Sequence, residues 1–246
     1  MPTRIGEVEA LFRYPVKSMS GESADVADLG WHGLDGDRRL AFRRADDRGG
    51  FPFLTASRLP EMILFAPLRR GPDVEGSLPT HVRTPAGAEL DLFGDALATD
   101  VSRRCGSPVE MLHFNRGIFD EASVSLIAAS TVEQVGRLAA RSPDVRRFRP
   151  NILLRTLQSL PFEEDNWVGG LLTFGGSSDA AAIAITNRDE RCSMINVDPD
   201  SAESAPEVLK AVVRERNNKV GVYGTVIRRG RLTVGQPVFF LPARER

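Results

Sequence analysis

The sequence predicts a β-rich α+β fold, because short strand-like segments outnumber helical ones along its 246 residues. In the first hundred residues, turn signals such as Gly33 and Asp35-Gly36 recur between short apolar segments. Frequent short strands of this kind are typical of a small barrel or sandwich. Hydrophobic residues make up 41% of the chain, and this length is sufficient for the core of one large domain or two small ones.

The first half of the chain is expected to consist mainly of strands. The first strand spans Arg4–Tyr14 and ends at Pro15, which lacks the N–H that a central strand needs. Pro85-Ala86-Gly87 predicts a hairpin turn. Further strands are predicted at Arg39–Arg44, Phe51–Thr55, Met62–Ala66, Thr80–Thr84 and Glu89–Leu92. From a change in pattern near residue 112, we predict an N-terminal domain at residues 1–111 and a second domain at residues 112–246.

The second half mixes helices with buried strands. Ser130 has the position of an N-cap and Glu133 follows three residues later, which predicts a helix from Ser130 to about Ala140. Pro206 suits the first turn of a helix that ends near Arg216. The other predicted elements are a helix at Asp95–Cys105, strands at Val109–Phe114, Ala180–Thr186 and Val222–Ile227, and a final hairpin through Arg229-Gly230 into Gln236–Leu241.

Composition argues against several classes of protein. The 32 basic residues are balanced by 33 acidic ones, so nucleic-acid binding through bulk positive charge is not expected. The longest apolar run, Ala180–Ile185, is far shorter than the ~20 residues that span a membrane. The N-terminus has charges where a signal peptide needs an apolar region, so we expect a cytoplasmic protein without membrane contact. Cys105 and Cys192 are then expected to be free thiols.

Common catalytic and nucleotide-binding motifs do not occur in this sequence. The Gly-rich segment Gly169–Ser178 lacks the GK[ST] ending of a phosphate-binding loop and is expected to be a hairpin. The three histidines, His32, His81 and His113, are too far apart for a metal motif of the HxxxH type. There is also no G-x-S-x-G nucleophile motif.

Two segments in the first half suggest anion binding. In YPVKS (Tyr14–Ser18), Lys17 follows a strand-ending proline and offers an ammonium group beside hydroxyl and backbone N–H donors. In GDRR (Gly36–Arg39) and the later FLTASR, Arg38 and Arg58 offer planar guanidinium groups for a phosphate or carboxylate. For either segment alone, exposed basic side chains at turns and strand ends are the simpler interpretation.

Two segments in the second half add a rigid polar clamp and a cysteine. In FRPN (Phe148–Asn151), Arg149 and Asn151 flank a proline that favours extended backbone at Arg149. Cys192 lies between a strand rich in Ala and Ile and a VDPD turn, with Arg188 and Arg191 nearby. Guanidinium groups favour the thiolate, which is the form that binds metals. A solvated arginine and a buried structural cysteine remain the alternatives.

Together these segments resemble, in order and spacing, those of MOSC domain proteins, named for the C-terminal part of molybdenum cofactor sulfurase. The similar stretches are YPVKS, FRPNI, RC followed by VDPD, and VGxPV at Val234–Val238. The chain is most similar to two-part members, which include bacterial reductases of N-hydroxylated compounds and the mitochondrial amidoxime-reducing component. The resemblance covers Ile5 to Leu241 and implies a MOSC-type β-barrel with peripheral helices plus a smaller N-terminal β-barrel domain.

The resemblance also implies a molybdenum cofactor, a pterin dithiolene with a phosphate tail, and assigns Cys192 as the catalytic residue and molybdenum ligand. A soft thiolate suits a metal that is already bound by dithiolene sulfurs. Ser130 and Thr131 are candidates because a helix start presents N–H groups to an anion. The residues implied to hold the cofactor are Lys17, Ser18, Arg38, Ser125, Ser130, Thr131, Arg149, Asn151, Arg191 and Tyr223.

We therefore predict a molybdenum cofactor-dependent oxidoreductase that reduces small N-hydroxylated compounds such as amidoximes, hydroxylamines or N-hydroxylated bases. Two cysteines are too few for an iron–sulfur cluster, so the electrons are expected from a separate protein. The alternative is a non-catalytic carrier of the cofactor or of sulfur, because MOSC domains also occur attached to a pyridoxal-phosphate cysteine desulfurase. A third interpretation is a β-rich anion-binding protein without catalysis.

Overall fold

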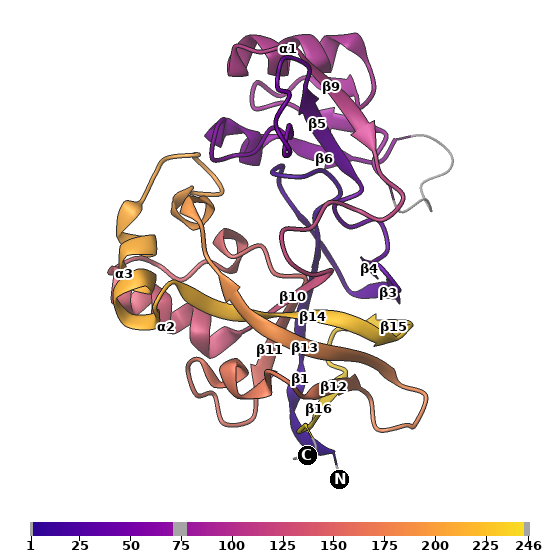
Figure 1. Cartoon of the computed structure of the whole chain (residues 1–246), viewed down its shortest axis with the longest axis vertical. Coiled ribbons are helices and arrows are strands. Elements are labelled where there is room, and N and C mark those ends of the chain that lie inside the picture. Colours follow the sequence, from indigo (N-terminus) through magenta and orange to yellow (C-terminus); the bar gives the residue numbers. More distant parts are fainter. Residues whose placement is uncertain (1, 71–77, 244–246) are drawn as a thin grey trace.

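The computed structural model describes residues 2–70 and 78–243, and its larger part is a β-barrel (Figure 1). The barrel strands are β1 (Thr3–Arg13), β10 (Val124–Ala128), β11 (Ile152–Thr156), β12 (Leu171–Phe174), β13 (Ala181–Glu190), β14 (Lys219–Arg228) and β16 (Pro237–Leu241). In the described residues they follow the order β11-β10-β14-β13-β12-β16-β1, and pairing of β11 with β1 closes the ring. The β-rich fold class predicted from the sequence is therefore confirmed.

The first strand belongs to this barrel although its partners come from the second half of the chain. β1 pairs antiparallel with both β11 and β16, and the short strand β2 (Glu22–Ala24) extends the sheet beside it. Both termini lie at the same end of the barrel, at the bottom of Figure 1. The division at residues 111 and 112 stays a prediction, and a cut there separates β1 from the strands with which it pairs.

Two helices cover one side of the barrel. All five residues of β10 are buried, because it is packed between the barrel core and helix α2 (Ala129–Ala139). β11 runs parallel to β10, and a parallel pair needs a crossover such as the one that contains α2. Helix α3 (Pro206–Arg216) lies beside α2, and Val135 and Val212 belong to the buried cluster between them.

A second lobe lies above the barrel in Figure 1 and has its own hydrophobic core, in which Phe42, Phe65 and Leu97 are fully buried. Its elements are β5 (Leu40–Arg44), β6 (Ala66–Leu68), β7 (His81–Arg83), β8 (Glu89–Asp91), β9 (Val109–His113) and helix α1 (Asp95–Cys105). They form the antiparallel sheets β5–β9 and β6–β7–β8. A further small sheet flanks the barrel and consists of β15 (Gly230–Thr233), β3 (Val26–Gly30) and β4 (Gly33–Leu34).

Short 3-10 helices complete the described structure. Their bounds are Pro60–Leu64 (η1), Val145–Arg147 (η2), Glu163–Trp167 (η3) and Ser193–Asn196 (η4). η2 and η4 contact each other, and both contain residues that line the main pocket. These connectors therefore bring the FRPN and RC segments together.

The longer predicted elements agree with the structure. The helices predicted at Asp95–Cys105 and Pro206–Arg216 have these bounds as α1 and α3. The hairpin predicted at Gly169–Ser178 is present, since β12 and β13 pair antiparallel across it. The Pro85-Ala86-Gly87 turn joins β7 to β8, with the Gly87 N–H donating to the Thr84 carbonyl.

Three predicted elements are wrong. Phe51–Thr55 is not a strand, because only Phe53 forms an isolated bridge, with Arg43. Met62–Ala66 lies mostly in the 3-10 helix η1, which Pro60 opens with its fixed φ. Arg229-Gly230 does not close a hairpin, because β15 pairs with β3 while β16 pairs with β1 and β12.

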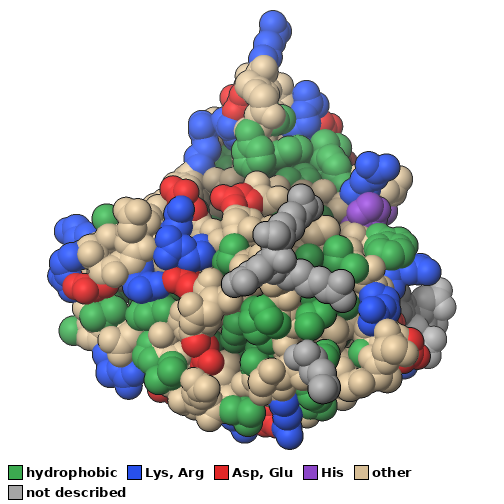
Figure 2. Space-filling model, turned by 60° about the horizontal axis from the view of Figure 1, so that its bottom comes forward, with side chains coloured by type: hydrophobic (Ala, Val, Ile, Leu, Met, Phe, Trp, Pro, Cys, Tyr) green, Lys and Arg blue, Asp and Glu red, His purple; other side chains and the backbone are tan. Residues whose placement is uncertain are grey.

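The surface of the barrel end carries charges of both signs. Figure 2 shows basic and acidic side chains interspersed with hydrophobic ones, so neither sign dominates this face. No helix in the described residues has the length and apolar character needed to cross a membrane.

Candidate functional site

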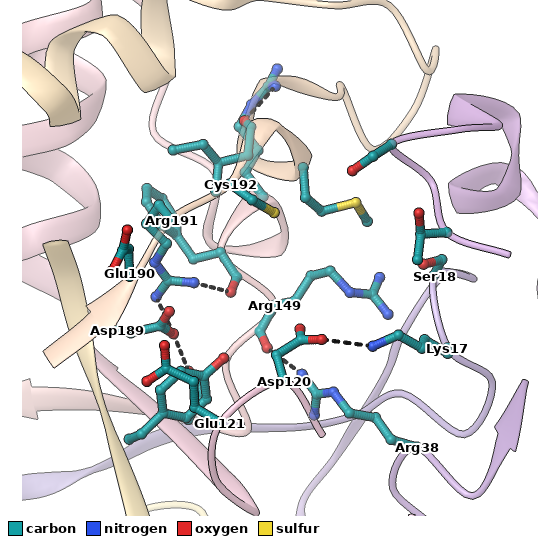
Figure 3. Close-up of a pocket in the computed structure, with 18 residues that line it drawn as sticks. Lys17, Ser18, Arg38, Asp120, Glu121, Arg149, Asp189, Glu190, Arg191 and Cys192 are labelled. Carbon is teal, nitrogen blue, oxygen red and sulfur yellow. Dashed lines mark hydrogen bonds and ion pairs between the residues drawn. The ribbon is translucent and has the colours of Figure 1, made fainter. Parts of the chain in front are cut away.

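The main cavity lies where the barrel meets the second lobe and has a volume of about 290 Å³ (Figure 3). Its walls come from loops that leave β1 and β4, from the connector between β9 and β10, and from the ends of β10, β13 and η2. Segments far apart in the sequence therefore converge on one pocket. It is lined by Lys17, Ser18, Arg38, Thr55, Ser57, Asp120, Glu121, Ser125, Arg147, Phe148, Arg149, Asp189, Glu190, Arg191, Cys192, Met194, Ile195 and Tyr223.

The YPVKS loop supplies a buried lysine. After Pro15, the backbone N–H of Lys17 donates to the Leu40 carbonyl at 2.7 Å, which ties the loop to the start of β5. The Lys17 ammonium donates to Asp120 Oδ1 at 2.9 Å, although only 8% of the Lys17 side chain is exposed. Ser18 beside it has a φ of 66°. The loop thus holds a cation at the wall of the pocket.

Arg38 is fixed from several directions. Its guanidinium lies 2.5 Å from the fully buried carboxylate of Asp37, and it also donates to the Arg149 carbonyl at 3.0 Å. Asp37 in turn accepts the backbone N–H of Tyr14 at 2.7 Å. Burial disfavours the charged guanidinium, but the neighbouring Asp37 outweighs it, so the pKa of Arg38 is raised.

Arg149 is oriented without a carboxylate partner. One of its N–H groups donates to the Met19 carbonyl at 2.7 Å, and its guanidinium lies 4.2 Å from the centre of the Tyr14 ring. Among the described residues, no carboxylate lies within ion-pair distance of it, and burial lowers its pKa to about 10. Arg149 is therefore a half-buried cation without a paired carboxylate, and its charge is available to a ligand.

Three residues that line this pocket have a strained backbone conformation. Ser18, Arg38 and Arg149 have positive φ values of 66°, 50° and 50°, a region that residues other than glycine rarely adopt. All three line the cavity. Such conformations cost on the order of 1 kcal/mol or more each and cluster at binding and active sites. The strain aims the three side chains from loops whose course is fixed by hydrogen bonds.

Cys192 lies exposed at the end of β13, directly before η4. The preceding Arg191 points inward and donates to the carbonyls of Val220 at 2.7 Å and Phe148 at 2.8 Å. Gly221 has a φ of 78°, and a Cβ there would lie 2.8 Å from Arg191 Nη2. The arginine thus anchors the cysteine loop to β14, and the Cys192 side chain is left at the pocket.

The barrel wall of the pocket contains a buried carboxyl group, that of Asp189 on β13. Asp189 forms an ion pair with Arg191 at 2.9 Å and accepts a hydrogen bond from the Ser125 hydroxyl at 3.1 Å. Burial raises the pKa of Asp189 to about 6, despite the opposing charge of Arg191. Burial and the negative charge of Asp189 both raise the pKa of Tyr223.

The structure brings most of the predicted site residues together. The cavity lining includes Lys17, Ser18, Arg38, Ser125, Arg149, Arg191, Cys192 and Tyr223. Asn151 lies behind this wall and is fully buried. Its amide oxygen accepts the backbone N–H of Ser125 at 3.1 Å, and its amide nitrogen donates to the Phe12 carbonyl at 3.3 Å. In this structure Asn151 positions the wall from behind and does not line the cavity.

Ser130 and Thr131 do not line the pocket, and the helix begins earlier than predicted. Helix α2 starts at Ala129 with Ala128 as its N-cap, and the Ser130 hydroxyl donates to the Leu160 carbonyl at 3.0 Å. The start of the helix faces the protein's own carboxylate instead of a ligand. Glu164 is fully buried there, accepts the Thr131 hydroxyl at 2.8 Å, and has a pKa raised by burial to about 7.

Several lining residues were not predicted from the sequence. Asp120 and Glu121 come from the connector between β9 and β10, which carries no motif. The FLTASR segment reaches the pocket through Thr55 and Ser57, whereas Arg58 is not among the lining residues. The only signal for Thr55 and Ser57 in the sequence is that they lie in the same segment as Arg58.

Cys192 is the lining residue best suited to bind a soft metal. No group of three His, Cys, Asp or Glu side chains that would suit a metal ion occurs in residues 2–70 and 78–243. A metal that arrives with dithiolene sulfurs needs only one thiolate from the protein. An exposed thiol in the same pocket as Lys17, Ser18 and Arg149 (Figure 3) therefore fits a metal group with an anionic tail.

Comparisons with known proteins agree with this architecture. A sequence model of the MOSC domain matches residues 103–239, and one of the MOSC N-terminal beta barrel domain matches residues 5–104. A comparison with curated protein sequences finds no match. The crystal structure of the YuaD protein from Bacillus subtilis is 14% identical, with a TM-score of 0.53, and the match covers 99% of this chain and all of that one. YiiM from Geobacillus stearothermophilus is 18% identical, with a TM-score of 0.38, over 48% of this chain and 54% of that one.

Proposed function

The chain belongs to the MOSC domain family, and from this premise we propose that it is a molybdenum cofactor-dependent oxidoreductase that reduces small N-hydroxylated compounds. The observation that carries the proposal is the exposed Cys192 thiol in a pocket that also contains the unpaired cation Arg149. A thiolate supplies the metal ligand, and the cations supply attraction for a phosphate tail. We expect the reaction to take place in the cytoplasm, where the thiol stays reduced.

The residues of this chain would hold the cofactor and control its surroundings. Cys192 would bind the metal, and Lys17, Ser18 and Arg149 would bind the anionic part. The bound group would supply the two-electron chemistry that a protein side chain cannot. Arg38 and Asn151 would keep the wall in place, because their hydrogen bonds join three loops.

The open side of the pocket would receive the substrate. Thr55 and Ser57 offer hydroxyl groups and Met194 an adaptable apolar surface. Together they suit a small molecule with an N–OH group, whose hydroxyl both donates and accepts hydrogen bonds. Of the carboxyl groups that line the pocket, Asp189 has a pKa raised by burial to about 6, close enough to neutral for it to exchange a proton with a bound substrate. A separate protein would supply electrons.

The metal content of the purified protein tests the proposal. The protein is made in a host that synthesises the cofactor, and molybdenum is measured by mass spectrometry in the unchanged chain, Cys192→Ala and Cys105→Ala. We expect about one metal per chain, with a loss of roughly tenfold in Cys192→Ala only. Cys105 is a matched control because its thiol contacts the carbonyls of Ser102 and Ser107, away from the pocket. Equal molybdenum in all three proteins would remove Cys192 as the ligand.

Turnover separates the reductase from a carrier. The loaded protein is mixed with an amidoxime and a reduced dye, and the amidine product is measured. We expect steady turnover, which Cys192→Ala loses. A cofactor or sulfur carrier, favoured equally by an exposed thiol, would load molybdenum without forming product. That result would replace the reductase with the carrier.

A further inference from the structure

The arginines that line the main cavity are paired with one exception. Arg38, Arg147 and Arg191 pair with Asp37, Asp198 and Asp189 at distances of 2.5, 2.5 and 2.9 Å. In two of these pairs, Arg38–Asp37 and Arg191–Asp189, the carboxylate is almost fully buried. Separating such a pair would leave an unpaired charge in the protein interior, which is strongly unfavourable. These two pairs therefore belong to the scaffold of the pocket, and Arg147 is held in addition by the carbonyl of Asn196 at 3.1 Å. The cations left for a ligand are Arg149 and Lys17.

The ion pair of Lys17 differs from the scaffold pairs. Its carboxylate, Asp120, has 68% of its side chain exposed, whereas the Lys17 side chain is buried. Asp120 lies in the connector between β9 and β10, and Figure 3 shows it between Lys17, Arg38 and Arg149. Partial desolvation opposes its ionisation, but Lys17, Arg38 and Arg149 outweigh this and lower the pKa of Asp120. Asp120 therefore carries its charge at the point where the cations converge.

The connector places few constraints on the main chain around Asp120, although the neighbouring Glu121 side chain accepts a hydrogen bond from Asn187. Its upstream part is tied down, because the N–H groups of Phe114 and Ile118 donate to the carbonyls of Arg39 and Arg38. From residue 119 to residue 123, no main-chain hydrogen bond to another described residue is found. Because most of the Asp120 carboxylate already faces solvent, moving it into water costs less than moving a buried carboxylate, provided that another anion takes its place at Lys17.

We propose that Asp120 is a built-in counter-anion, which a phosphomonoester ligand must displace from Lys17, and that it thereby excludes weakly charged anions. This inference rests on the proposed function, since it concerns the anionic part of the same ligand. A monoanion exchanges one negative charge for another and gains nothing from Lys17. A dianionic phosphate gains a net charge–charge attraction and interacts with Arg149 as well. Asp120 is in this sense a specificity-determining residue.

Binding of small phosphate and sulfate esters tests this in the full-length protein without added metal. Phenyl phosphate is dianionic at about pH 8, because the second pKa of a phosphomonoester is about 6. Phenyl sulfate has the same shape and one charge less. Calorimetry compares the unchanged protein with Asp120→Asn and with Glu110→Gln. Glu110 is a matched control, because it is an exposed carboxylate paired with Arg43 at 2.8 Å outside the cavity lining.

We expect Asp120→Asn to bind phenyl phosphate about five- to tenfold more tightly and to make phenyl sulfate binding measurable. Glu110→Gln is expected to change neither affinity. Weaker or unchanged phosphate binding in Asp120→Asn overturns the proposal, as does the same increase in Glu110→Gln. Absence of phosphate binding in every protein also overturns it, because Lys17 freed of Asp120 must attract the dianion. The molybdenum measurement is independent, so either proposal can fail while the other stands.

Discussion

The two sides of the pocket are built differently. On the barrel side, Arg38 and Arg191 are each held by a buried carboxylate and by backbone carbonyls. On the side of the connector, Lys17 is held by one exposed carboxylate, Asp120. The barrel side is therefore a rigid support whose charges are compensated internally, and the connector side has a charge that a ligand can compensate. A pocket divided in this way keeps its shape without a ligand and still has affinity for an anion.

The largest expected effect is the loss of a scaffold carboxylate. Asp37→Asn removes the charge that balances Arg38, and the buried guanidinium is left without a counter-ion. We expect a loss of about 3 kcal/mol in the free energy of unfolding, measured by urea denaturation. Asp120→Asn removes the same charge from a carboxylate that is mostly exposed, although its partner Lys17 is buried, and is expected to cost less, about 1 to 2 kcal/mol. Similar losses in both variants would remove the distinction between the two sides.

A smaller effect is expected where the rigid side depends on backbone geometry. Gly221→Ala places a Cβ 2.8 Å from Arg191 Nη2 and 2.9 Å from the Leu126 carbonyl oxygen, at a φ of 78°. We expect about 2 kcal/mol of destabilisation and a lower midpoint of thermal unfolding. Gly87→Ala is the control for backbone strain alone, because its φ is 86° and no heavy atom lies within 4 Å of the added Cβ. Equal losses would show that the contacts with Arg191 and Leu126 contribute nothing.

Glu164 is a buried carboxyl group away from the pocket, and among the described residues it has no arginine partner like those of the rigid side. Burial raises the pKa of Glu164 from 4.5 to about 7 in the folded protein. The folded state therefore holds a proton that the unfolded state has released between about pH 4.5 and 7, and the stability that this proton provides decreases as the pH rises through this range. The free energy of unfolding is therefore expected to decrease between about pH 4.5 and 7, and this decrease should be roughly 1 to 2 kcal/mol smaller in Glu164→Gln. Urea denaturation at several pH values measures it.

Glu207→Gln serves as the control, since Glu207 is an exposed acid at the start of α3 and its pKa is lowered, first by its own backbone N–H and then by Arg141. Its loss of stability is expected at lower pH, where the folded protein must protonate it. An unchanged pH profile in Glu164→Gln would mean that Glu164 is already charged when folded.

Local patterns in the sequence predicted the fold better than the fine structure of the site. Helix α3 follows from Pro206 and its apolar spacing, whereas α2 begins one residue before the predicted N-cap Ser130. The reason is that Glu164, thirty-three residues from Thr131, satisfies the start of α2. Asp120 was missed for a similar reason, because its partner Lys17 is 103 residues away and the connector has no motif. Long-range pairs of this kind leave no local signal.

The smallest expected effect concerns Tyr14, which lies under the guanidinium groups of both Arg38 and Arg149 at 5.0 and 4.2 Å. Its hydroxyl is buried without a hydrogen-bond partner among the described residues, and burial raises its pKa to about 12. The ring therefore orients the arginines, while the hydroxyl adds a desolvation cost. We expect Tyr14→Phe to change stability by less than about 0.5 kcal/mol or to increase it slightly.

Tyr14→Leu tests the ring itself, since it keeps an apolar side chain but removes the π face. We expect phenyl phosphate affinity to be unchanged in Tyr14→Phe and to decrease by about threefold or more in Tyr14→Leu, because Arg149 then loses its orientation. If Tyr14→Phe weakened binding as much as Tyr14→Leu, the hydroxyl would have to contact the ligand. Arg149 and Tyr14 would then both contact the anion. Tyr14 would belong to the part of the pocket that binds the ligand and not only to its rigid support.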